Sequence, residues 1–143
     1  MKTKKYLMLT IAFLAVQITN SQTDLELITA TLNDYIEGTA NGKPDKLKKA
    51  FHPDFNLYTI TGDSLRIWRG RDYVGKFKEG EKSSRIGRII SIDYENNAAI
   101  AKAEIIIPNW RIFTDYFLLL KYEGAWKIVH KSYTWKEYPK SEN

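Results

Sequence analysis

Residues 110–135 constrain the fold of this chain more than any other segment. They form two runs rich in β-branched and aromatic residues, separated by Tyr122-Glu-Gly-Ala125, which is typical of a β-hairpin with a tight turn. Strand side chains alternate between faces, so Phe113, Asp115 and Phe117 share one face of the first strand. A carboxylate on an aromatic face is costly to bury unless it is paired or protonated. Asp115 is therefore the first candidate for a pocket residue.

Two helices are predicted ahead of the strands. Thr23 and Glu26 have the spacing of a capping box, and Gly38 or Gly42 is expected to end the first helix. Its apolar residues recur at helical spacing, namely Leu25, Ile28, Leu32, Tyr35 and Ile36. Pro44 is suited to the first turn of a second, short helix. The apolar face of this second helix is expected to be Leu47, Ala50 and Phe51, with an end at His52-Pro53.

The rest of the chain is predicted to be mainly strands. They are expected at residues 55–60, 65–68, 85–94 and 99–107, before the long hairpin, with a short helix near 72–78. Ala99, Ala101 and Ala103 fall on one face and would let a helix lie close to the sheet. Helices first and strands last, with the final four strands in a meander, favour an α+β fold. We expect one domain, residues 22–143, in which a strongly curved antiparallel sheet forms a cone around the N-terminal helices.

The first 21 residues have the pattern of a secretory signal peptide. Three lysines among the first five residues precede an apolar run at 7–16, and small residues then precede Gln22. The run is too short to cross a bilayer. We expect export to the periplasm or the exterior with cleavage near Ser21-Gln22, and no membrane association afterwards. The alternative is an ordinary first helix.

Charge and composition exclude several functional classes. The chain has 22 Lys and Arg against 17 Asp and Glu, and beyond residue 21 the balance falls to 19 against 17. A nucleic-acid binder would show a far stronger basic excess. The absence of cysteine excludes disulfides, thiol catalysis and zinc–thiolate sites. The two histidines lack metal-ligand spacing, so we expect no metal and no cofactor.

Several separated motifs occur in an order that resembles a known family. They are Tyr35-Ile-Glu-Gly38, Leu47-Lys-Lys-Ala-Phe-His-Pro-Asp54, Thr114-Asp-Tyr116, and Gly124-Ala-Trp-Lys-Ile-Val129 followed by Lys131. From about residue 24 to 135 the chain resembles the putative lumazine-binding branch of the nuclear-transport-factor-2-like (NTF2-like) superfamily, which includes SnoaL-like cyclases and ketosteroid isomerase. The resemblance implies a cystatin-like cone with a largely apolar cavity, often in a homodimer. Fold analogy does not assign chemistry.

Two residues are candidates for acid–base chemistry. Asp115 matches the Asp of the family's Thr-Asp-Tyr motif. In ketosteroid isomerase a carboxylic acid kept neutral by an apolar site donates a hydrogen bond to a substrate oxygen, and Asp115 could act likewise if it has no cationic partner. The alternative is a structural carboxylate paired with Arg, Lys or a Tyr hydroxyl. By the resemblance His52 lies near the cavity mouth, as a general base or as a cap on helix carbonyls. His130 is expected to be structural, on one strand face with Trp126, Ile128 and Ser132.

Aromatic residues are the candidates for ligand binding, because a cone fold turns several of them toward its cavity. They are Tyr35, Tyr58, Trp68, Trp110 and Tyr116, although some are expected to serve packing or a dimer interface.

Three functions remain open at this point. The first is binding of a small, partly apolar molecule. The second is a cofactor-independent isomerase, dehydratase or cyclase using Asp115 and His52, which a Tyr such as Tyr35 or Tyr58 converging on Asp115 would favour. The third is a homodimeric interaction module with a collapsed cavity, which Trp110, Tyr133 and Trp135 outside the cone would favour. A homodimer through the outer face of the last four strands is expected because helices cover only one side of the sheet.

Overall fold

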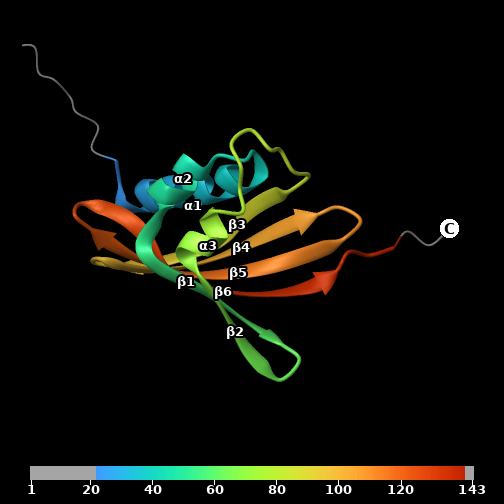
Figure 1. Ribbon diagram of the computed structural model, residues 1–143. Helices are drawn as coiled ribbons and strands as arrows, with labels where there is room; N and C mark the ends of the chain where they lie inside the picture. The colour runs from blue at the N-terminus through green and yellow to red at the C-terminus, as the bar shows by residue number, and fades with distance from the viewer. Residues whose placement is uncertain (1–21, 141–143) are drawn as a thin grey trace, which may run out of the picture.

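The computed structural model describes residues 22–140, so the predicted signal peptide lies outside the described residues. Two helices lie over one face of a curved six-stranded sheet. The β1–β2 hairpin forms one edge of this sheet and projects beyond the other strands (Figure 1). The elements are α1 (Asp24–Ala40), α2 (Pro44–Ala50), β1 (Phe51–Thr61), β2 (Ser64–Arg69), α3 (Gly70–Val74), β3 (Ile86–Glu95), β4 (Ala98–Ile107), β5 (Arg111–Tyr122) and β6 (Ala125–Glu137). The predicted α+β class is confirmed.

The ends of α1 follow local rules. The Thr23 side chain accepts a hydrogen bond from the Glu26 amide, and the Glu26 carboxylate accepts one from the Thr23 amide, so the capping box is confirmed. The helix ends at Ala40, and Gly42 takes the positive φ of 57° that glycine tolerates. Leu25 is 46% exposed and does not share the buried face predicted for it.

The second helix is shorter than predicted. Pro44 occupies its first turn as expected, but the helix ends at Ala50 and β1 begins at Phe51. Phe51 was therefore wrongly placed on the helix: its backbone is already extended, and its ring stacks on Phe55 at 3.8 Å between centroids. His52 precedes a proline and lies inside the strand, as the preference of that position for extended backbone explains.

The sheet runs in the order β2-β1-β6-β5-β4-β3. The predicted meander from β3 to β6 is antiparallel throughout. One pairing departs from the expectation of an entirely antiparallel sheet, because β1 lies parallel to β6. This pairing places the β1–β2 hairpin beside the end of the meander and creates one wall of the cavity described below.

A one-residue bulge in β6 changes which side chains point inward along the part of the strand that follows it. Leu119 pairs with Ile128 but Leu118 pairs with His130, which leaves Val129 as the extra residue. His130 therefore does not share the face of Trp126 and Ile128, as strict alternation predicted. Its ring stacks on Tyr58 and its Nε2 lies 2.7 Å from the Ser132 hydroxyl. The residues that turn inward instead are Lys131, Tyr133 and Trp135.

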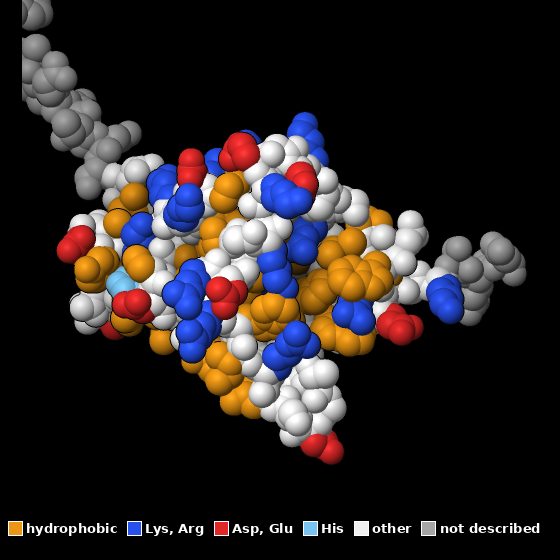
Figure 2. All heavy atoms as spheres, viewed as in Figure 1, with side chains coloured by type: hydrophobic (Ala, Val, Ile, Leu, Met, Phe, Trp, Pro, Cys, Tyr) orange, Lys and Arg blue, Asp and Glu red, His pale blue; other side chains and the backbone are white. Residues whose placement is uncertain are grey.

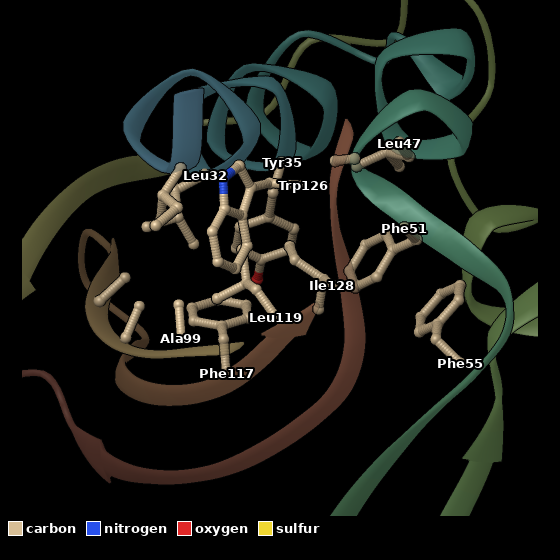
Figure 3. Packing of buried hydrophobic residues seen from close by; sticks show 14 of the residues in the cluster. Leu32, Tyr35, Leu47, Phe51, Phe55, Ala99, Phe117, Leu119, Trp126 and Ile128 are labelled. Atoms are coloured by element: carbon tan, nitrogen blue, oxygen red, sulfur yellow. The ribbon is translucent and has the colours of Figure 1, made fainter. Parts of the chain in front are cut away.

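The core lies between α1, α2 and the inner face of the sheet. Figure 3 shows Leu32 and Tyr35 of α1 above Phe117 and Leu119 of β5, with Phe51 at one side. The three alanines predicted to admit a helix belong to this core, with Ala103 fully buried. Within residues 22–140, no helix combines the length and apolar character that a membrane span requires.

Candidate functional site

A cavity of about 500 Å³ opens beside the core. Its walls come from β1, β2, α3, the segment after α3, and the ends of β4, β5 and β6. Aromatic side chains dominate the lining, namely Tyr35, Trp68, Tyr73, Phe77, Trp110, Phe113, Tyr133 and Trp135. Its size is in the range of small-molecule sites, roughly 300–1,000 Å³. The cavity is open, as the binding and enzyme alternatives require.

Three buried polar side chains meet at the edge of this cavity. The Tyr35 hydroxyl donates to Oδ2 of Asp115 at 2.6 Å. Lys131 Nζ donates to the Tyr35 hydroxyl at 2.7 Å and lies 2.9 Å from the same Oδ2 atom. Asp115 is completely buried, and Lys131 is 5% exposed. The three residues form a closed triangle, which we call the Asp–Tyr–Lys cluster.

The proton of Tyr35 stays on its oxygen. Burial first, and then the negative charge of Asp115, raise the pKa of Tyr35 well above its usual value of 10.0. The hydroxyl is therefore a donor to Asp115 at any physiological pH, and its lone pairs accept from Lys131. This fixes the direction of both hydrogen bonds.

Two buried polar atoms at the cavity lack a hydrogen-bond partner within residues 22–140. They are Oδ1 of Asp115 and Nε1 of Trp68. Unpaired buried polar atoms are rare in folded proteins, and each costs about 1–3 kcal/mol. The cluster saturates one oxygen of the carboxylate and leaves the other, Oδ1, buried without a partner within residues 22–140.

The structure brings together some of the predicted site residues. Tyr35, Trp68, Trp110 and Asp115 all line the cavity. Of the two tyrosines considered as partners of Asp115, Tyr35 is the one that converges on it. Tyr133 and Trp135 also line the cavity, whereas their placement on the outer sheet face would have favoured the interaction-module alternative.

Three other predicted residues lie away from the cavity. His52 is packed edge-on against Tyr122, and its Nδ1 accepts from the Asp54 amide. Tyr58 stacks on His130, and Tyr116 is 49% exposed with Lys102 over its ring. Strand alternation explains the tyrosines: Leu57 and Thr59 on β1 face the cavity, so Tyr58 faces away, and Tyr116 faces away for the same reason beside Asp115.

Asp115 has the cationic partner that the neutral-acid hypothesis excluded. Lys131 supplies it, and a Lys or a Tyr hydroxyl was the structural alternative. Sequence reasoning did not select Lys131 as a site residue, because strict alternation from Ile128 would turn it outward. The only signal available was its place in the family motif. Within residues 22–140, no group of His, Cys, Asp and Glu has an arrangement that could hold a metal.

Comparison with known proteins found a matching family and a similar sequence. The family model described as "Putative lumazine-binding" matches residues 23–134. An aldolase, FrzH, from a Cladobotryum species is 29% identical over 122 residues, which are 82% of this chain and 94% of that protein.

Solved structures of NTF2-like proteins are similar to this chain. An NTF2-like protein of unknown function from Methylobacillus flagellatus KT is 29% identical, with a TM-score of 0.70 over 83% of this chain and 97% of that one. An NTF2-like protein from Shewanella baltica OS155 is 23% identical, with a TM-score of 0.71 over 82% of this chain and 100% of that one. The second likeness shows the fold alone.

Proposed function

The chain belongs to the putative lumazine-binding family of NTF2-like proteins, and from this membership we propose that it binds a small, partly aromatic molecule in its cavity. The observation that carries the proposal is the cavity of about 500 Å³ with aromatic walls and the unpaired Asp115 Oδ1. Flat side chains favour a flat ligand. A hydroxyl or N–H group of the ligand would satisfy the carboxylate oxygen.

A neutral dye tests this proposal. N-phenyl-1-naphthylamine fluoresces when an apolar site binds it, and we expect saturable binding at one site per chain. Thr59 lines the cavity, so Thr59→Trp should fill the space and abolish binding. Ile60→Trp introduces the same side chain at the next residue, which is 61% exposed, and should leave binding unchanged. Equal binding by both variants, each shown to be folded by circular dichroism, would exclude the cavity as the site.

A second candidate function is acid–base catalysis on a carbonyl compound. Two observations favour it: the oriented carboxylate of Asp115, and the likeness to a protein named as an aldolase. Asp115 Oδ1 would take a proton from the carbon next to the carbonyl, the C–H electron pair would form the enolate double bond, and the carbonyl π pair would move to oxygen. Lys131 uses two N–H groups in the cluster and retains a third that could donate to that oxygen.

Phenylpyruvate is a suitable probe of this step, because it has an aromatic ring and exchangeable protons next to a carbonyl. We expect the protein to accelerate their exchange in D₂O, followed by NMR, and Asp115→Asn to reduce the acceleration at least 100-fold. His52→Gln should leave the rate unchanged, because His52 lies outside the cavity. Binding of the probe without faster exchange would leave the protein as a binder and reject the catalytic function.

A further inference from the structure

We propose that the ligand of this cavity is an organic anion, whose carboxylate, sulfonate or phosphate lies at the cavity mouth. This inference rests on the proposed binding function and narrows its ligand class. Four basic side chains line the cavity in addition to the buried Lys131: Arg66, Lys76, Arg85 and Arg111. They come from β2, the segment after α3 and the start of β5. Figure 2 shows Lys and Arg side chains interspersed with hydrophobic ones between β2 and the end of β6.

These four cations lack carboxylate partners in the part of the chain that the structure describes. None of them takes part in any of the salt bridges within residues 22–140. Among the described residues, Asp115 is the only acid that lines the cavity, and Lys131 already pairs with it. The cavity therefore has an excess of positive charge, although the chain beyond residue 21 is nearly balanced, with 19 basic and 17 acidic residues.

Aromatic rings hold these cations in place. Lys76 Nζ lies 3.3 Å from the centroid of the Trp68 ring, and the Arg66 guanidinium lies 4.5 Å from it. The Arg111 guanidinium lies 3.6 Å from the Trp135 ring. Stacking of this kind is attractive and keeps the charged groups against the walls. Trp68 also carries a buried Nε1–H that has no hydrogen-bond partner within residues 22–140.

The same rings indicate the polarity of the uncharged part of the ligand. A molecule held between the aromatic walls is apolar where it meets them, and its charged end reaches the cations stacked on Trp68 and Trp135. A cavity of about 500 Å³ suits one or two fused rings rather than a polymer. An aromatic or otherwise apolar acid meets all of these conditions, whereas an amine would meet an excess of like charge.

A matched pair of dyes tests the inference. 8-Anilinonaphthalene-1-sulfonate has the rings of N-phenyl-1-naphthylamine plus one sulfonate. We expect the wild-type protein to bind the sulfonate at least tenfold more tightly, with an affinity that falls as salt rises. Lys76→Gln/Arg111→Gln should remove this preference, measured as the ratio of the affinities for the two dyes. Lys102→Gln is the control, because Lys102 lies over the ring of Tyr116, outside the cavity.

The outcomes separate the two proposals. If both dyes bind equally well, Thr59→Trp blocks both and the double variant changes neither, the anion inference is rejected while the binding function stands. If Thr59→Trp blocks neither dye, the binding function itself fails. Displacement of the sulfonate dye by 1-naphthoate or by 1-naphthyl phosphate supports the inference and identifies the preferred charged group. Displacement by 1-naphthylmethanol at the same concentration as these acids would overturn it.

Discussion

Lys131 Nζ lies 2.9 Å from Oδ2 of Asp115, across neighbouring strands and beneath α1. The two residues are not paired directly in the sheet: Asp115 is opposite Tyr133, and Lys131 is opposite Phe117. The diagonal contact arises because the bulge at Val129 turns Lys131 inward. Burying either charge alone would be strongly unfavourable, so each residue makes the other tolerable in the core.

The ion pair predicts that the effect of replacing one of these residues on the free energy of unfolding depends strongly on whether the other is present. Lys131→Met leaves the Asp115 carboxylate without its counter-charge and should reduce the free energy of unfolding by about 3–5 kcal/mol. Asp115→Asn should also destabilise at pH 7. The double variant should lose clearly less than the sum of the two, by at least 1 kcal/mol. Urea denaturation of the four proteins measures this coupling, and additive losses would show that the contact is energetically unimportant.

The raised pKa of Tyr35 predicts that the protein loses stability at alkaline pH. Its pKa is raised in the folded protein by burial and by Asp115, so the fold keeps a proton that the unfolded chain loses near pH 10.0. The stability that this group contributes is fully present below that pH and falls as the pH rises toward the folded pKa. Tyr35→Phe should destabilise by about 1–2 kcal/mol at pH 7. It should also flatten the decline between pH 9 and 11. A parallel decline in both proteins would contradict the raised pKa.

The lowered pKa of Asp34 predicts that the protein loses stability in acid. Burial opposes its ionisation, but hydrogen bonds from Lys49 and Lys46 outweigh this and lower its pKa. Its contribution is therefore present above about pH 3.8 and is lost as the pH falls through the lower, folded value. Asp34→Asn should cost about 1–2 kcal/mol at pH 7 and little at pH 2. The control is Asp45→Asn, which breaks an exposed pair with Lys48 and should cost under about 0.5 kcal/mol.

The outer sheet face predicts a homodimer. Large apolar side chains remain exposed there on β4 and β5, namely Ile100, Tyr116, Leu118 and Leu120, each between 40% and 58% exposed. A patch of this kind on a soluble protein is commonly covered by a partner. Light scattering at micromolar concentration should give twice the mass of one chain. Leu118→Lys should yield a monomer, whereas Leu65→Lys on the distant β2 should not. A monomeric wild-type protein would reject the dimer.

The N-terminal pattern predicts export. Expression of the full chain in a bacterial host should deliver protein to the periplasm or medium, and its intact mass should correspond to loss of residues 1–21 or nearly so. Replacing two leucines of the apolar run, Leu7 and Leu9, by aspartate should retain the precursor inside the cell. Secreted protein that still carries the apolar run would show that the segment is not cleaved.

Local sequence signals determined most of the secondary structure. The Thr23–Glu26 capping box, Pro44 and the Glu123-Gly124 turn act through hydrogen bonds and dihedral preferences within a few residues, and each is found where the sequence predicts it. The order of helices and strands then limits the fold to one curved sheet with helices on one face. Asp115 was identified for the same reason, since alternation along an unbulged strand is a local property.

Pairing between strands that are distant in the sequence decided which side chains of β6 face the cavity. The sequence carries no sign that Val129 is the extra residue, because a bulge results from matching β6 to β5 on one side and to β1 on the other. That single residue turns Lys131, Tyr133 and Trp135 to the cavity side of the sheet and His130 to the other side. The cations at the cavity mouth likewise come from segments separated by up to 45 positions, from Arg66 to Arg111. The sequence by itself determined the elements and the buried acid. Only the tertiary structure placed Lys131 beside Asp115 and brought the other basic side chains together around the cavity. Both arrangements depend on contacts between segments that are far apart in the chain.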